Sequence, residues 1–302
     1  MNVALVIFPI FALILLGIAL RRWAETGEAF WRGLERLIFY AFFPALLFHT
    51  LSHAEIDFAA ATPMLLTGVG YSLIGMGLGY ATKFLFNDPP RVFAAAFQCS
   101  FRFNSYVGLA VAGALFGKPG IAAIGLLMGF LVPMSNIAAV AVLARHGEGK
   151  WLQSIVGNPL ILATAGGVAF GLAGWRLPGL IDATLELLAR ASLPLGLIAV
   201  GAGMRLTGLH HARGHLWYGI LVKLLVLPGI AWLLALAFAL DGLWFQSAIL
   251  LAALPHSTVA YVLAVRMGAD GQVAAAQVTL TTLLSMLTLP AWLAAASLAR
   301  PF

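Results

Sequence analysis

The sequence predicts an all-α membrane protein with ten transmembrane helices, arranged as two five-helix halves that enter the membrane in opposite directions. Three observations predict this fold class. Of the 302 residues, 62% are hydrophobic and only 9% are charged, whereas soluble domains have about one quarter charged residues. Many of the apolar runs reach the roughly 20 residues that a membrane-spanning helix needs. Finally, proline and glycine residues recur in matching places of the two halves.

The ten spans follow from the apolar runs in chain order. We expect them at residues 3–20, 34–51, 62–84, 92–116 and 121–144 in the first half, and at 157–174, 178–204, 215–240, 244–267 and 272–298 in the second. The connections are short, and the two longest lie at about 21–33 and 205–214. They leave no room for a separate soluble domain. The 32 glycines suit close helix packing in lipid.

The distribution of basic residues predicts the orientation. With both termini outside, the inner connections hold ten Lys and Arg residues, and the outer connections and tail hold only Lys118, Arg176 and Arg300. Cytoplasmic loops are enriched in Lys and Arg. We therefore expect a multi-pass protein of the cell's inner (plasma) membrane, with its N-terminus and C-terminus outside.

Recurring residues divide the chain into a first repeat, residues 1–150, and a second, residues 151–302. The matches at offsets of 150 or 151 are Pro9 and Pro159, Gly17 and Gly167, Pro44 and Pro194, Gly117 and Gly268, and Gly120 and Gly271. Each half has five spans, an odd number, so the second half enters the membrane in the opposite sense. Such an inverted repeat is typical of alternating-access carriers.

Two polar interruptions stand in corresponding places of the halves. The fourth span is broken by residues 100–105, with the sequence Ser-Phe-Arg-Phe-Asn-Ser, and the ninth by residues 254–257, with the sequence Leu-Pro-His-Ser. A break in the bilayer leaves backbone N–H and C=O groups unpaired, and it is tolerated only where these groups line a cavity or are buried in protein. Paired breaks of this kind indicate the binding site of a secondary transporter.

The chemistry of the breaks favours an anion. Each break starts a new half-helix, and the N–H groups and dipole at a helix N-terminus attract negative charge. Two crossed breaks would form a carboxylate-sized site without a metal. The small polar residues there either contact the ligand or cap freed backbone groups. The polar candidates are Asn104 and Ser105 in the first break and Ser257 and Thr258 in the second. Pro255, beside them, is a further candidate.

Four further residues near the breaks are candidates for the same site. Arg102 could hold a carboxylate through its planar fork, or else snorkel or pair with an acid inside the protein. His256 could couple transport to protons or be a satisfied neutral histidine. Gln98 and Asn136 either line the site or form interhelical hydrogen bonds.

The seventh span carries Asp182, Glu186 and Arg190 at four-residue spacing. Residues four apart share a helix face, so Glu186 and Arg190 are expected to pair. The two carboxylates either belong to a neutralised group near the outer interface or form a proton or counter-ion site. Neither break contains Asp or Glu, which argues against a strong sodium site at the crossing.

Other classes of protein are disfavoured. The scattered Lys and Arg residues argue against nucleic acid as a partner, and Cys99, as a single cysteine, excludes a cysteine metal cluster. The chain shows no catalytic motif of the common hydrolase, nucleotide-binding or zinc-protease types, so we expect no enzyme and no cofactor. We expect no metal either, because His210, His211 and His215 lie in a basic loop without acidic or cysteine partners.

Several motifs together resemble the auxin efflux carrier family, whose bacterial members include malonate transporters. They are residues 42–46 (Phe-Phe-Pro-Ala-Leu), residues 104–109 (Asn-Ser-Tyr-Val-Gly-Leu), residues 158–160 (Asn-Pro-Leu) and the Leu254–Pro255 break. The resemblance covers essentially the whole chain. It implies ten helices with crossed, broken fourth and ninth helices, transport of organic anions, and a fold similar to that of bile acid sodium symporters.

The sequence therefore predicts a carrier of small organic anions, such as mono- or dicarboxylates, embedded in the lipid bilayer. By analogy with the family, spans 1, 2, 6 and 7 form a scaffold, and spans 3–5 and 8–10 form a core that moves in an elevator-like way. The family is also compatible with a homodimer through the scaffold. Alternatives are a sodium-dependent symporter of bile-acid-like anions, a channel and a non-transporting sensor. The anion, the direction of transport and the coupling ion stay open.

Overall fold

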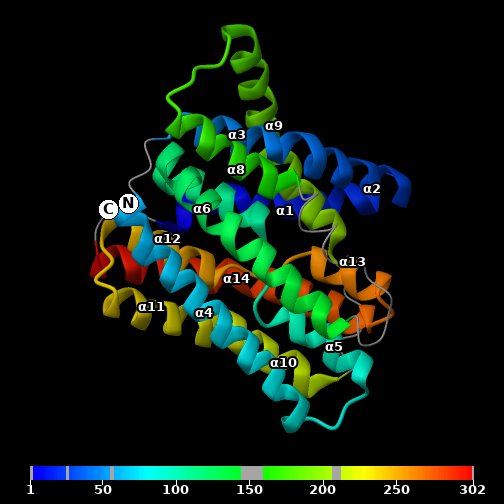
Figure 1. Ribbon diagram of the computed structural model, residues 1–302. Coiled ribbons are helices and arrows are strands. Elements are labelled where there is room, and N and C mark those ends of the chain that lie inside the picture. Colours follow the sequence, from blue (N-terminus) through cyan, green and yellow to red (C-terminus); the bar gives the residue numbers. More distant parts are fainter. Residues whose placement is uncertain (1–2, 25–26, 55–57, 144–158, 206–211, 301–302) are drawn as a thin grey trace. The chain divides into compact units, whose positions relative to one another are not determined.

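The computed structural model describes residues 3–24, 27–54, 58–143, 159–205 and 212–300, and within these ranges it contains helices and no strands (Figure 1). The helices of the first half are α1 (Val3–Trp23), α2 (Glu28–Leu37), the π-helix η1 (Ile38–Phe42), α3 (Phe43–Ser52), α4 (Phe58–Leu85), α5 (Pro90–Cys99) and α6 (Ser105–Leu143). Those of the second half are α8 (Pro159–Leu172), α9 (Gly179–Gly203), α10 (Arg213–Leu221), the π-helix η3 (Val222–Val226), α11 (Leu227–Ala237), α12 (Gly242–Ala253), α13 (Val259–Arg266) and α14 (Gly271–Ala299).

Among the described residues, seven helical stretches are long and apolar enough to span a membrane. The prediction of an all-α membrane protein is thus confirmed, whereas the count of ten spans and their inverted repeat stay predictions. The count of seven differs from ten partly because α6 joins two helices across Gly117, whose φ of 64° and ψ of −149° are not helical. The predicted fourth and ninth spans also contain interruptions, so their pieces α5, α12 and α13 are short.

The chain divides into two compact units, each built from several segments. Unit 1 comprises Met1–Phe58, Tyr106–Gly129 and Gln153–Gly203, and unit 2 comprises Ala59–Ser105, Phe130–Leu152 and Met204–Phe302. The predicted boundary between residues 150 and 151 lies outside the described residues, and the division into two sequence repeats stays a prediction.

Within unit 1, α1 packs closely against α9 through glycine. A Cβ atom on Gly17 of α1 would lie 2.1 Å from the carbonyl oxygen of Ile198, and one on Gly201 of α9 would lie 1.8 Å from that of Ile14. Such distances exclude any side chain at either glycine. Small residues of this kind let helices approach in lipid, where van der Waals packing drives their association.

The helices α3 and α8 of unit 1 pack in the same way. A Cβ atom on Gly167 of α8 would lie 3.0 Å from the carbonyl oxygen of Phe48, and one on Gly171 would lie 3.0 Å from that of Leu51. The helix α3 also packs against α9. Glycine at crossing points therefore brings the backbones in unit 1 close together.

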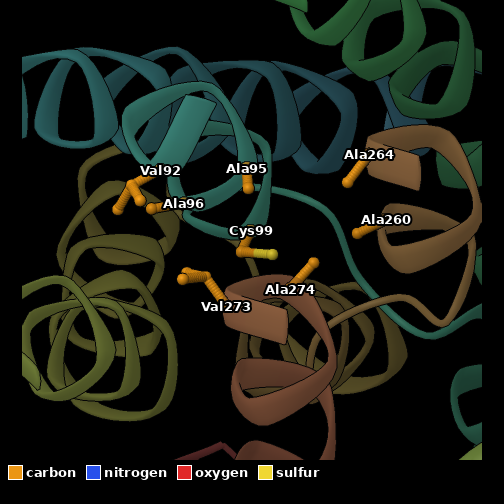
Figure 2. Packing of buried hydrophobic residues seen from close by; sticks show 8 residues of the cluster. All are labelled: Val92, Ala95, Ala96, Cys99, Ala260, Ala264, Val273 and Ala274. Carbon is orange, nitrogen blue, oxygen red and sulfur yellow. The ribbon is translucent and has the colours of Figure 1, made fainter. Parts of the chain in front are cut away.

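Within unit 2, a cluster of small buried side chains joins α5, α13 and α14. Figure 2 shows these side chains, which point toward one another: Val92, Ala95, Ala96 and Cys99 from α5, Ala260 and Ala264 from α13, and Val273 and Ala274 from α14. The helix α5 ends where the first polar interruption begins, and α13 starts just after the second. The cluster therefore holds the flanks of both interruptions together.

Candidate functional site

The first interruption separates α5 from α6. The N–H of Arg102 still donates to the carbonyl of Gln98 at 3.2 Å, and α6 begins at Ser105. The next polar residue, Asn104, is 1% exposed. This short non-helical stretch therefore runs through the buried interior of unit 2.

The second interruption follows the end of α12 at Ala253. A proline disfavours helical backbone in the residue before it, and Leu254 is extended, with φ −62° and ψ 148°. Pro255 itself has no N–H to donate. The N–H of His256 donates to Thr281 Oγ1 of α14 at 3.2 Å. Proline thus explains why the chain leaves the helix here, and a threonine satisfies part of the freed backbone.

A backbone hydrogen bond joins the two interruptions directly. The N–H of Asn104 donates to the carbonyl oxygen of Pro255 at 2.9 Å. The residues are 151 positions apart, which is also the offset that relates Gly117 to Gly268. Each interruption therefore satisfies one freed backbone group of the other, as buried peptide groups require.

Arg102 lies buried beside the first interruption and contacts an amide. It is 6% exposed, and its Nη2 donates to Oδ1 of Asn136 at 2.8 Å. Its Nη1 is buried and has no hydrogen-bond partner in the described part of the chain. The structure thus brings together two of the sequence-predicted residues, and the arginine neither snorkels nor pairs with a described carboxylate.

Lys223 is a second buried cation in unit 2. It lies in η3, is fully buried, and its Nζ donates to the carbonyl oxygen of Ala252 at 2.9 Å. The last carbonyls of a helix lack partners within that helix, so the ammonium group satisfies one at the end of α12. Short π-helical segments often occur at functional sites. A lysine within a span can either snorkel or face inward, and here Lys223 is buried.

His256 is fully buried in the second interruption. Within the described residues neither ring nitrogen has a hydrogen bond of normal geometry, although the ring interacts with the backbone of Gln277 and with Lys223. Burying a polar group without a good hydrogen bond has a cost. The imidazole is therefore weakly satisfied and lies near a basic side chain.

The remaining candidates of unit 2 have mainly structural contacts. Nε2 of Gln98 donates to the carbonyl of Ala260 at 3.0 Å, which ties α5 to α13. Oγ of Ser257 accepts a hydrogen bond from the N–H of Val259 at 3.3 Å and caps the start of α13. Ser105 and Thr258 are partly buried, and Pro255 is buried.

Asp182 and Glu186 lie on α9 in unit 1. Glu186 accepts a hydrogen bond from Nη2 of Arg190 at 2.8 Å, as their spacing predicts. Asp182 instead lies beside His49, with 3.2 Å between Oδ1 and Nε2. Sequence reasoning missed this histidine, although its spacing from His53 was visible.

The expectation that His215 lies in a loop without an acidic partner is wrong, because it is buried in α10 beside Asp88. His210 and His211 lie outside the described residues, whereas Nδ1 of His215 lies 2.8 Å from Oδ2 of Asp88. Asp88 therefore pairs with the His215 ring through an ion pair or a hydrogen bond.

Known proteins are similar to this chain in sequence. The sequence profile of a family described as "Membrane transport protein" matches residues 146–293. The chain is 28% identical over 296 residues to a protein of Rhizobium meliloti (strain 1021) named "Putative malonate transporter", and the match covers 93% of this chain and 92% of that protein. These matches support membership of the auxin efflux carrier family of membrane transport proteins. The resemblance in the sequence motifs is thereby confirmed.

A second relative is also named as a transporter. The chain is 25% identical over 294 residues to a protein of Methanothermobacter thermautotrophicus named "Uncharacterized transporter", and the match covers 95% of this chain and 96% of that protein. Both relatives thus match along nearly their whole length. The protein is a membrane-embedded transporter.

Proposed function

We propose that the protein is a secondary carrier of small organic anions, held at the junction of the two interruptions and exposed to each side of the membrane in turn. The observation that carries the proposal is the hydrogen bond from the Asn104 N–H to the Pro255 carbonyl oxygen, at 2.9 Å. This bond supports a crossing of the two interrupted helices, and such crossings hold substrates in carriers built from inverted repeats.

Charge supports an anionic substrate. Arg102 and Lys223 are both buried in unit 2, and no carboxylate in the described ranges is paired with either. A buried charge without a counter-charge is costly. A carboxylate that binds near the guanidinium group would offset part of that cost, and Arg binds carboxylates through two parallel hydrogen bonds. The N–H groups at the starts of α6 and α13 would add to the attraction.

The name of one relative suggests the first substrates to test. The Rhizobium protein is named for malonate, a dicarboxylate. Two buried cations in one unit suit two carboxylates better than one. We therefore place short dicarboxylates ahead of monocarboxylates in the substrate panel.

The inverted repeat is part of the same proposal. Gly117 and Gly268 both have a positive φ, of 64° and 72°. They stand 151 positions apart, after each interrupted helix. A glycine with positive φ at both places supports a structural repeat beyond the sequence match. The proposed repeat has five helices in each half, and a rocking or elevator-like motion of its core would give alternating access.

Transport by purified protein in liposomes tests the proposal. Labelled mono- and dicarboxylates are supplied with and without sodium and pH gradients. We expect saturable uptake and counterflow of at least one short carboxylate. A strict sodium requirement would favour a symporter instead. Flux that does not saturate would favour a channel, and binding without transport would favour a sensor.

A further inference from the structure

Two histidines and a carboxylate from different helices meet in unit 1. His49 lies near the end of α3, and His53 follows that helix directly. Asp182 lies in the first turn of α9, which packs against α3. Oδ1 of Asp182 lies 3.2 Å from Nε2 of His49 and 3.5 Å from Nε2 of His53. One ligand atom from each residue lies within 4.8 Å of the other two.

These distances match a metal coordination sphere. Zinc binds imidazole nitrogen and carboxylate oxygen at about 2.0–2.2 Å in tetrahedral geometry, which places neighbouring ligand atoms about 3.3 Å apart. The two separations that involve Oδ1 of Asp182, 3.2 and 3.5 Å, bracket this value, and the two histidine nitrogens lie within 4.8 Å of each other. Histidines four residues apart on a helix are a recurrent zinc-binding arrangement, and His49 and His53 have this spacing at the end of α3. The three side chains could therefore bind an ion with little movement.

The hydrogen bonds of His53 fix which nitrogen is available. Its Nδ1 lies 2.8 Å from the carbonyl oxygen of His49 and 3.3 Å from Oγ of Ser52. The Ser52 hydroxyl itself donates to that same carbonyl, at 3.1 Å, so both neighbours of Nδ1 act as acceptors. Nδ1 of His53 therefore carries the proton, and in the neutral ring the lone pair lies on Nε2. Metal-binding histidines commonly donate their other N–H to a backbone carbonyl in this way.

Nε2 of His53 lies near an acceptor, Oδ1 of Asp182, at 3.5 Å. Oδ1 of Asp182 is buried and has no hydrogen-bond partner within the described residues. Two acceptors at 3.5 Å repel each other unless a cation or a proton lies between them. His49, the other nitrogen donor, is 8% exposed. The arrangement thus places one buried carboxylate oxygen 3.2 and 3.5 Å from two imidazole nitrogens, a geometry that a shared cation would suit.

We propose that His49, His53 and Asp182 bind a divalent first-row transition-metal ion, with zinc as the ion the donor set suits best. Two imidazoles and one carboxylate leave a fourth tetrahedral position open to water or to an anion. The ion would join α3 to α9 and so link the ends of two helices in unit 1. Two other charges act on His49, from Lys118 and Glu186, and Glu186 is held by Arg190. The site is independent of the proposed transport reaction.

Direct metal binding tests the proposal. Tag-free protein in detergent is titrated with Zn²⁺ alone by calorimetry, and with Co²⁺ as a spectroscopic substitute. We expect one ion per chain and a visible Co²⁺ absorption typical of tetrahedral coordination. Asp182→Asn and His53→Gln should each weaken Zn²⁺ binding at least tenfold. Because imidazole must be deprotonated to bind, affinity should fall as the pH is lowered.

Glu186→Gln is the matched control. It also converts a carboxylate to an amide, one turn further along α9, at a residue paired with Arg190. It should change Zn²⁺ affinity less than threefold. Thermal melts in zinc-free buffer show whether each variant is folded, and added Zn²⁺ should raise the melting temperature of the wild type but not of Asp182→Asn. The proposal is overturned if Zn²⁺ does not bind at micromolar concentration, or if all three variants bind it as the wild type does. Transport assays are not needed for this outcome.

Discussion

Arg102 and Lys223 illustrate what single residues contribute and how far a sequence can reveal it. The position of Arg102 next to Asn104 predicts a charge inside the interruption, and the structure buries it. Its partner Asn136 could not be assigned from sequence, because it lies 34 positions away on another helix. Lys223 was equally undetermined, since a long side chain within a span can either snorkel or turn inward. Contacts over long sequence distances depend on packing that no local pattern records.

Replacing Arg102 tests its role as a substrate ligand. Hydrogen bonds to charged groups contribute about 1.5–3 kcal/mol, so Arg102→Ala should weaken transport of a carboxylate roughly 10- to 100-fold. Arg102→Lys keeps the charge but loses the planar fork, and we expect it to recover only part of this loss. Uptake by liposomes measures the effect. Arg190→Ala, which removes an exposed arginine from α9, should leave transport unchanged. Normal uptake by folded Arg102→Ala would refute the assignment.

Lys223→Met separates substrate binding from stability. Methionine has a similar length and no charge, and replacing a buried charge by an apolar residue is often neutral or stabilising. The variant should therefore fold, yet it removes one of two buried cations in unit 2. We expect the apparent affinity for dicarboxylates to fall more than that for monocarboxylates, as measured by competition in the uptake assay. Equal losses of affinity for dicarboxylates and monocarboxylates would contradict a role for Lys223 in binding a second carboxylate.

At the scale of helices, the interruptions are the features that the sequence predicts best. Pro255 removes an N–H and restricts the residue before it, and Asn104 belongs to a run with Arg102 and Ser105 that interrupts an otherwise apolar span. Both effects are local. The π-helical segments η1 and η3 were not predicted, because a π-helical turn differs from an α-helical one by a single residue and has no clear composition. The break of α6 at Gly117 appeared in the sequence only as a gap between two apolar runs.

Glycine packing makes a prediction about helix association. In Gly201→Ala the new Cβ would lie 1.8 Å from the carbonyl oxygen of Ile14. Forcing α1 and α9 apart should cost about 1–3 kcal/mol, as overpacking of cores does. The matched control is Gly77→Ala in α4, where a Cβ meets nothing within 4 Å. That variant should be neutral or slightly stabilising, because Ala favours helix over Gly by about 1 kcal/mol. Thermal unfolding in detergent compares the two, and equal melting temperatures would contradict the packing argument.

At the scale of the whole chain, two contacts in unit 1 repeat each other. Gly17 lies against the carbonyl of Ile198, and Gly167 lies against that of Phe48. Adding 150 to Gly17 and Phe48 gives Gly167 and Ile198. The same pair of positions is thus used twice, once from each half. Recurring glycines and prolines predict a repeat in the sequence, and the structure adds that two of the matched positions make equivalent contacts.

The orientation of the chain also awaits a test. The excess of basic residues in the predicted inner connections implies that both termini lie outside. A reporter that is active only outside the cytoplasm, such as alkaline phosphatase, should therefore be active when fused after Phe302. A fluorescent protein that matures only in the cytoplasm should stay dark at the same position. The opposite pattern would reverse the predicted topology, and the ten-span count would then need revision.

The hydrogen bond between Asn104 and Pro255 involves only main-chain atoms. A change of side chain at either residue leaves both bonding groups in place, except for a proline at position 104, which would remove the N–H. The side chains around the junction can therefore vary while this main-chain hydrogen bond is kept. Relatives with different cargoes could in this way share one junction, and exchanging a few lining residues would be a rational route to altering the preferred cargo.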